Sequence, residues 1–164
     1  MKKKKNPVLW LTQGAVIAAV YVVLTLVFAP ISFGPMQVRV SEILTILPLF
    51  TSAAVPGLFI GCLLANLFGG AIVWDILFGS IATLIGAAVG YLLRFNRWLV
   101  PIPNVISNAL IVPLVLQYGY GMTDVPYIWM VVYVAAGELI GCYIMGELFA
   151  SVLLKYKRYM FGRK

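Results

Sequence analysis

Long apolar runs, interrupted by short stretches of charged or turn-forming residues, fill almost the whole of this 164-residue chain. A transmembrane helix needs about 20 predominantly apolar residues, and runs of that kind account for nearly all of the sequence. The pattern predicts an all-α membrane protein, a single bundle of six transmembrane helices within one domain, residues 1–164. The predicted spans are residues 8–29, 39–52, 54–70, 75–93, 98–118 and 126–154.

The span over residues 39–52 is short and contains Arg39, Glu42 and Pro48, so it needs separate support. Basic residues favour the cytoplasmic side of a membrane. With six spans and a cytoplasmic N-terminus, every lysine and arginine except Arg39 falls on that side. Without this span, all the basic residues after residue 93 would lie outside. The charge pattern therefore predicts six spans with both termini in the cytoplasm.

The first apolar run, from Val8 to Ala29, follows four lysines, which is also how a signal peptide begins. This run is longer than the apolar core of a signal peptide, and no small-x-small cleavage site closes it. We therefore expect a retained first helix. The outside connections are predicted to be residues 30–38, 71–74 and 119–125, and the first of these should be a loop, because it contains Pro30, Gly34 and Pro35.

Composition narrows the possible functions. Hydrophobic residues make up 63% of the chain and charged residues only 10%, against about a quarter charged in a soluble domain. The net charge of +7 comes from residues at the ends of spans, so it indicates membrane topology and not nucleic-acid binding. Histidine is absent, and no phosphate loop, nucleophile elbow or metal-ligand spacing is present. We predict that the chain is not an enzyme and holds no metal or cofactor. Cys62 and Cys142 are expected to be buried small side chains.

Small residues recur every fourth position within the spans, which lets helices approach closely in lipid. Tight packing within the bundle is the expected role for most of them. For Ala15 and Ala19 a partner protein is an alternative. The other positions are Gly57, Gly61, Ala65, Gly69, Ala82, Gly86, Gly90, Gly137 and Gly141.

Polar and charged side chains inside a span are costly, so each needs an explanation. In the six-span topology Arg39, Glu42 and Asp75 lie near the outer surface, and Glu138 lies near mid-depth. We predict a cavity that opens to the outside, lined by Glu42, Asn66, Trp74, Asp75, Asn108 and Glu138.

Most of these side chains also have a purely structural interpretation, which stays open. Arg39 and Glu42, three residues apart, are able to satisfy each other, and Asp75 is able to cap a helix. The amides of Asn66 and Asn108 are able to join helices by hydrogen bonds.

Three further residues differ in how well a structural role explains them. Trp74 also fits an aromatic belt at the membrane surface. Glu147 is close to Lys155 and the basic tail, which suggests an interfacial charge. No lysine or arginine is predicted at the depth of Glu138, so a functional role is favoured there.

Five motifs together resemble the queuosine-precursor transporter family, QueT, over nearly the whole chain and in the same order. They are Val38-Arg-Val-Ser-Glu-Ile-Leu-Thr-Ile-Leu-Pro48, Pro56-Gly-Leu-Phe-Ile-Gly-Cys-Leu-Leu-Ala-Asn66, Trp74-Asp-Ile-Leu-Phe-Gly-Ser-Ile-Ala-Thr83, Pro103-Asn-Val-Ile-Ser-Asn108 and Gly137-Glu138-Leu139.

That family is grouped with the substrate-binding S components of energy-coupling factor (ECF) transporters. The resemblance implies a subunit of the bacterial cell membrane that captures a vitamin-like solute outside the cell. The implied partners are the lipid bilayer and an ECF module, which consists of a membrane scaffold protein and two cytoplasmic ATPases. S components carry an Ala-x-x-x-Ala motif that docks the scaffold, and Ala15 and Ala19 fit it.

The resemblance implies a 7-deazaguanine substrate, in particular 7-aminomethyl-7-deazaguanine. Its guanine edge presents two donors that a carboxylate accepts, and Glu42 and Glu138 are the candidates. Asn66 and Asn108 are candidate donors to the ring carbonyl.

The cationic aminomethyl group would favour Asp75 or Glu42, and the flat ring would stack on Trp74. Arg39 fits poorly against a cation, so we expect it to pair with Glu42 or to act as a gate. The loop over residues 30–38 is expected to close over the ligand.

Other functions stay open from the sequence. The chain also fits an S component for a different vitamin, or a non-transport membrane scaffold in which Glu138 and Asn108 only join helices. A self-sufficient proton-coupled carrier that uses Glu138 is a further alternative.

Overall fold

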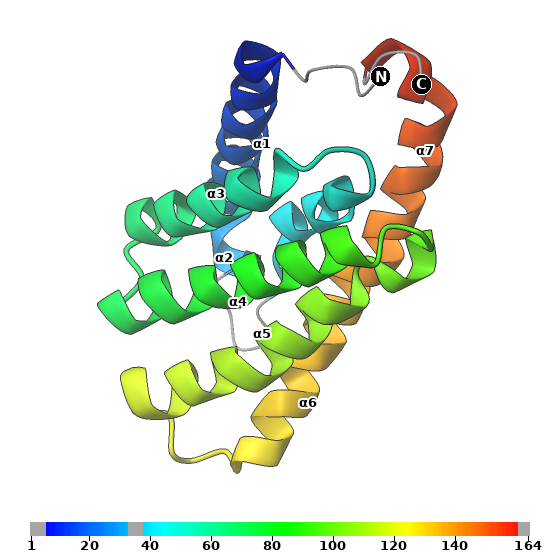
Figure 1. Cartoon of the computed structure of the whole chain (residues 1–164). Helices are drawn as coiled ribbons and strands as arrows, with labels where there is room; N and C mark the ends of the chain where they lie inside the picture. The colour runs from blue at the N-terminus through cyan, green and yellow to red at the C-terminus, as the bar shows by residue number, and fades with distance from the viewer. Residues whose placement is uncertain (1–5, 33–37, 161–164) are drawn as a thin grey trace.

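The computed structural model describes residues 6–32 and 38–160, and helices joined by short connections make up these ranges (Figure 1). No strand occurs within these ranges. Two elements, η1 and η2, are 3₁₀ helices, and two, η3 and η4, are π-helical turns. The elements are α1 (Pro7–Val27), α2 (Ala29–Ser32), η1 (Val40–Leu49), α3 (Ala54–Phe68), α4 (Val73–Leu92), η2 (Arg97–Leu99), α5 (Ile102–Leu114), η3 (Val115–Gly119), α6 (Tyr127–Glu138), η4 (Leu139–Ile144) and α7 (Met145–Met160).

Four helical segments are long and apolar enough to cross a bilayer, which confirms a multi-pass, all-helical membrane protein. They are Pro7–Val27, Val73–Leu92, Arg97–Gly119 and Tyr127–Tyr156. The other two apolar helices are shorter, with 10 residues in η1 and 15 in α3. Helices therefore occupy all six predicted ranges, but only four of them reach spanning length by themselves.

The connection after α1 differs from the sequence prediction. Residues 30–32 form part of α2, so the prediction of a loop was wrong there, and residues 33–37 lie outside the described ranges. Pro30 stands at the second position of this short helix, where its fixed φ angle and missing N–H are tolerated. At α4 the helix begins at Val73, two residues before the predicted start.

The 3₁₀ helix η1 occupies the centre of the molecule. It packs against α1, α3, α4, α7 and η4, and Figure 1 shows it in cyan between α1 and the long α6–α7 segment. Its buried residues are Ser41, Glu42, Leu44, Thr45, Ile46, Leu47 and Pro48. One end of η1 is therefore polar and buried, and the other end is apolar and buried.

The packing of α1 on α3 depends on small residues, as the sequence predicted. A Cβ added at Gly57 would lie 2.7 Å from the carbonyl oxygen of Gly14. A Cβ added at Gly61 would lie 2.8 Å from Cβ of Tyr21. Helices approach this closely only where side chains are absent. The close approach of α1 and α3 carries Tyr21 into the centre of the molecule, where it is fully buried.

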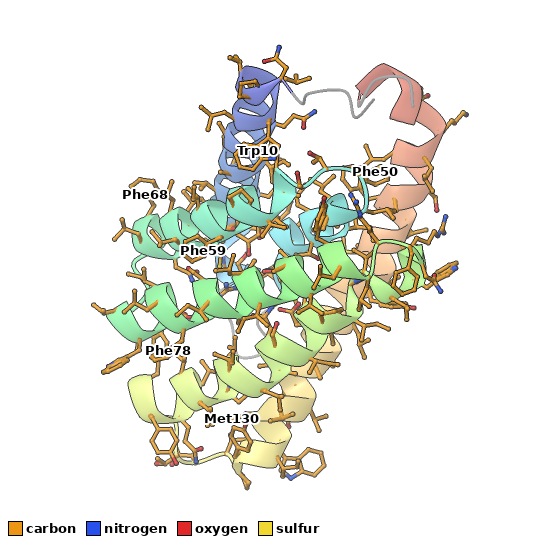
Figure 2. The ribbon with its side chains drawn as sticks, in the orientation of Figure 1. Trp10, Phe50, Phe59, Phe68, Phe78 and Met130 are labelled. Carbon is orange, nitrogen blue, oxygen red and sulfur yellow. The ribbon has the colours of Figure 1, made fainter. Side chains whose placement is uncertain are left out.

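Large apolar side chains cover the outside of the bundle. Figure 2 shows Phe68 and Phe78 projecting away from α3 and α4, and both are exposed. Tyr118 and Trp129 are also exposed, as is typical of aromatic residues at a membrane surface. Such a surface suits lipid and not water.

Candidate functional site

Polar side chains from several helices meet in the interior, although the surrounding bundle is apolar. Each is at most 4% exposed. We refer to this set as the polar cluster. Its members are Tyr21 from α1, Arg39, Glu42 and Thr45 at η1, Cys62 and Asn66 from α3, Asp75 and Thr83 from α4, Asn104 and Asn108 from α5, Glu138 from α6 and Cys142 from η4.

Two carboxylates of the cluster share one amide. The side-chain nitrogen of Asn104 donates to Oε2 of Glu42 at 2.9 Å and to Oε2 of Glu138 at 3.3 Å. The hydroxyl of Tyr21 donates to Oε1 of Glu42 at 2.5 Å. We call Glu42 and Glu138 the acid pair. The donors to these carboxylates are neutral groups from α1 and α5, so the acid pair joins four separate elements.

A cation lies on the other side of the cluster. Nη2 of Arg39 is 3.7 Å from Oδ1 of Asp75, and both side chains are buried. The hydroxyl of Tyr120 donates to Oδ2 of the same carboxylate at 3.2 Å. Because Tyr120 is 42% exposed, Asp75 connects the buried guanidinium to the surface of the molecule.

The sequence prediction for Asp75 and Arg39 is refined by these contacts. Asp75 is the third residue of α4 and not its cap, since Ile72 holds that position. The ion pair of Arg39 joins it to Asp75, which is 36 positions away in the sequence, and Arg39 also acts electrostatically on Glu42.

The two thiols are buried and free, as predicted. Cys62 Sγ accepts weak hydrogen bonds from Arg39 at 3.7 Å and from Thr83 at 3.5 Å. Cys142 Sγ lies 2.9 Å from the hydroxyl of Thr45. They fill space beside the charged groups. No group of metal-ligating residues occurs among the residues that the structure describes.

Three buried amide atoms of the cluster have no hydrogen-bond partner within the described part of the chain. They are Oδ1 of Asn66, Oδ1 of Asn104 and Nδ2 of Asn108. Leaving such an atom buried and unpaired costs about 1–3 kcal/mol. Unpaired polar atoms that cluster in the interior indicate a place where a ligand or water completes the bonding.

Glycines allow the backbone to bring these groups together. A Cβ added at Gly86 of α4 would lie 2.5 Å from both Cα and Oδ1 of Asn104. A Cβ at Gly141 of η4 would lie 3.0 Å from the carbonyl oxygen of Arg39. The small residues therefore position the polar cluster as well as the helices.

Trp74 is the one predicted ligand-binding residue that the structure does not place in the cluster. Its side chain is 58% exposed and stacks on Phe78, with 5.8 Å between ring centroids. Both rings line an apolar groove of about 610 Å³ on the outside of α4 and α5, together with Ile81, Ile111, Leu114, Val115, Tyr118 and Gly119. This position agrees with the alternative of an aromatic belt.

Two other predicted features lie apart from the cluster. Ala15 and Ala19 are exposed on α1. Glu147 contacts Arg97, with 3.0 Å between Oε2 and Nε, so its ion-pair partner among the described residues is an arginine that follows α4.

The polar cluster lies within a part of the chain that is similar to known proteins. Residues 11–155 match the model of the QueT transporter family. The chain belongs to this family. The matched range includes every residue of the polar cluster, and the family is one of transporters and not of enzymes.

A curated QueT relative supports the assignment. The chain is 35% identical over 98 residues to the protein named "Queuosine precursor transporter QueT" from Lactococcus lactis subsp. cremoris (strain MG1363). The match covers 58% of this chain and 56% of the relative. No solved structure matches the chain.

Sequence reasoning did not select the three neutral side chains that donate hydrogen bonds to carboxylates of the polar cluster: Tyr21, Asn104 and Tyr120. A signal for Asn104 exists, because it stands four residues before Asn108 and so shares its helix face. No local pattern marks Tyr21 or Tyr120, whose partners are 21 and 45 residues away.

Proposed function

We propose that the chain is the substrate-binding membrane subunit of an ECF-type importer and captures 7-aminomethyl-7-deazaguanine outside the cell. The observation that carries this proposal is the polar cluster, in which, among the described residues, buried Arg39 pairs with Asp75 and acts electrostatically on the buried carboxylates Glu42 and Glu138. Membership of the QueT transporter family and the name of the relative from Lactococcus lactis support a queuosine precursor as the solute.

The chemistry of the cluster fits this ligand. A 7-aminomethyl-7-deazaguanine carries N–H donors on its guanine edge and an ammonium on its side chain, and carboxylates accept both kinds of donor. Glu42, Glu138 and Asp75 supply such acceptors. The ring carbonyl needs a donor, and Nδ2 of Asn108 is buried without a partner. Full pairing of buried polar atoms would select this base over analogues that lack a donor.

The described state is closed, since every residue of the cluster is at most 4% exposed. Entry of the ligand therefore requires internal contacts to separate. The Arg39–Asp75 ion pair is the best candidate, because its nitrogen and oxygen are 3.7 Å apart and Tyr120 connects Asp75 to the surface. Arg39 would then act as a gate.

The proposed topology has six spans in the bacterial cell membrane and one domain over residues 1–164. The beginning of α1 and the end of α7 lie at the same end of the molecule (Figure 1), which supports placing both termini on one side. The lysines and arginines near these ends favour the cytoplasm.

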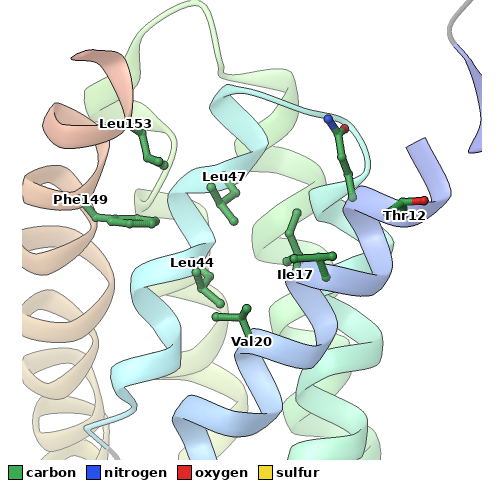
Figure 3. A pocket seen from close by; sticks show the side chains of 9 residues that line it. Thr12, Ile17, Val20, Leu44, Leu47, Phe149 and Leu153 are labelled. Carbon is green, nitrogen blue, oxygen red and sulfur yellow. The ribbon is translucent and has the colours of Figure 1, made fainter. Parts of the chain in front are cut away.

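A docking face for the ECF module is proposed on α1. Ala15 and Ala19 are exposed, so a partner helix can approach the backbone closely. Beside them is an apolar groove of about 290 Å³ between α1, η1 and α7, seen in Figure 3. Its lining includes Ile17, Val20, Leu44 and Phe149. A membrane scaffold protein would cover this face.

Direct titration of the purified full chain, reconstituted in nanodiscs, tests the function. The probes are 7-aminomethyl-7-deazaguanine, guanine, biotin and riboflavin, and the readout is calorimetry. We expect saturable binding of the deazaguanine alone. Binding of biotin or riboflavin instead would show an S component for another vitamin, and no binding of any probe would overturn the proposed ligand.

Docking is tested separately, by co-purification of the chain with a coexpressed ECF module. Ala15→Leu together with Ala19→Leu should abolish co-purification and leave calorimetric binding of the deazaguanine unchanged. Retained co-purification of this variant would contradict the docking face.

A further inference from the structure

The acid pair presents an unusual arrangement for two buried carboxylates. One amide nitrogen, Nδ2 of Asn104, is within 3.3 Å of an oxygen of each. Glu42 is 1% exposed and Glu138 is 4% exposed, so water screens their mutual repulsion poorly. The other side-chain atom of this amide, Oδ1 of Asn104, is buried and has no partner in the described part of the chain. This oxygen packs against α4 at Gly86, so the amide is held with its nitrogen directed at the two carboxylates.

The charges around the pair do not balance. Arg39 acts electrostatically on both carboxylates, but it is also the ion-pair partner of Asp75. Every other lysine and arginine belongs to the ends of the predicted spans. One cation therefore faces three carboxylates. Among the described residues, the remaining titratable groups that face the pair are Tyr21 from α1, Cys62 from α3 and Cys142 from η4, and none of these can supply a positive charge.

Two buried carboxylates that share one amide donor repel each other, and in a medium of low dielectric constant ionising both is costly unless a further cation compensates the second charge. A hydrogen bond from a neutral amide stabilises the negative charge of a carboxylate, but it does not change the net charge of the site. We propose that the acid pair holds one proton while the site is empty and releases it when a ligand carrying a primary ammonium binds. This inference rests on the proposed function, because it takes the cationic base as the ligand.

The exchange conserves charge at the site. The ammonium enters with one positive charge, and the proton leaves from a carboxyl oxygen of Glu42 or Glu138 to the outside water. The proton and the ammonium thus compete for the same two carboxylates. Lower pH outside should weaken binding, by up to about tenfold for each unit of pH while one proton is exchanged. The ligand class follows from this competition: a flat base with N–H donors and a primary ammonium.

Calorimetry in two buffers of different ionisation enthalpy, phosphate and Tris, tests the exchange at a fixed pH. The sample is the full chain in nanodiscs, and the probe is 7-aminomethyl-7-deazaguanine. The difference between the two binding enthalpies gives the protons released per ligand. We expect about one proton for the natural chain, and a dissociation constant that rises as pH is lowered from 8 to 6.

Glu138→Gln leaves a single carboxyl group and should abolish the proton release. Glu147→Gln is the matched control, since it removes a buried carboxylate of the same long helix outside the cluster, and its proton release should stay unchanged. If Glu138→Gln does not fold, the pH dependence of the dissociation constant of the natural chain still tests whether a proton is exchanged. Binding with no proton release, or proton release that persists in Glu138→Gln, would overturn the inference and leave the proposed function standing. Absence of binding by the natural chain would overturn the proposed function instead.

Discussion

Glu138 and Glu147 are buried carboxylates of the same long helical segment, Tyr127–Tyr156, yet their surroundings are opposite. Glu147 lies 3.0 Å from the guanidinium of Arg97, which also donates to Ser151 and packs over the ring of Trp98. Glu138 receives a hydrogen bond from the neutral amide of Asn104 and lies beside a second carboxylate. A buried charge with its own cation is already compensated, and removing that cation would destabilise the fold. A buried charge without one is suited to receive a cation from outside.

The sharpest test of this comparison exchanges each carboxylate for its neutral amide. Glu138→Gln should weaken binding of 7-aminomethyl-7-deazaguanine by at least about 2 kcal/mol, as for a lost charge-assisted bond. Glu147→Gln should leave the affinity within about twofold of the natural chain, a change well below 1 kcal/mol. Calorimetric titration of both variants in nanodiscs measures the difference. Equal losses of ligand affinity in the two variants would show that Glu138 and Glu147 do not differ in their role in binding.

The next test disturbs the cluster through the backbone. In Gly86→Ala the new methyl group would lie 2.5 Å from Asn104, so α5 must move and the amide would leave the acid pair. We expect a stability loss of about 1–3 kcal/mol from overpacking, together with weaker ligand binding. Gly146→Ala is the control, because its nearest contact is the carbonyl oxygen of Ile43 at 3.7 Å. Thermal unfolding in detergent and calorimetry read out the two effects, and equal behaviour of both alanines would contradict the prediction.

A third substitution should affect stability and leave binding unchanged. Arg97→Gln leaves the carboxylate of Glu147 buried without its cation, which should cost about 1–2 kcal/mol. Arg97 is itself 30% exposed, so water relieves part of the loss. A lower unfolding temperature with unchanged ligand affinity is the expected result. Arg94→Gln serves as the control, since Arg94 is exposed and packs over Tyr91. Weaker binding in Arg97→Gln would show that the two regions are coupled.

The smallest effect is expected at the surface end of the cluster. Tyr120→Phe removes the hydrogen bond of 3.2 Å to Asp75. Because Tyr120 is 42% exposed, losing this hydrogen bond should cost about 0.5–1 kcal/mol of stability at the contact. If Asp75 belongs to the gate, the ligand should then exchange faster. Stopped-flow fluorescence measures the exchange rate. Tyr118→Phe, at an 81% exposed tyrosine, should change nothing, and slower exchange in Tyr120→Phe would contradict the gate.

The sequence was sufficient to predict the helices and much of the cluster. Apolar runs marked all six helical ranges, and the cost of polar groups in lipid singled out Glu42, Asn66 and Glu138. It did not predict which side chains meet. The partner of Arg39 is Asp75 on a different helix, and such long-range contacts leave no local pattern. The orientation of Trp74 was also missed. Neighbouring helical residues point about 100° apart, so Trp74 faces outward because Asp75 faces inward.

The central position of η1 bears on how the protein is synthesised. A 3₁₀ helix of 10 residues extends only about 20 Å, less than the hydrocarbon core of a bilayer, and it begins beside Arg39 and Glu42. This segment is poorly suited to pass from the translocon into the bilayer without partner helices, because its polar groups would then contact lipid directly. Two of its neighbours, η4 and α7, are made after it. We therefore expect η1 to reach its final place only after the ribosome has completed η4 and α7, so that chains truncated before these helices would be substrates for quality-control proteases.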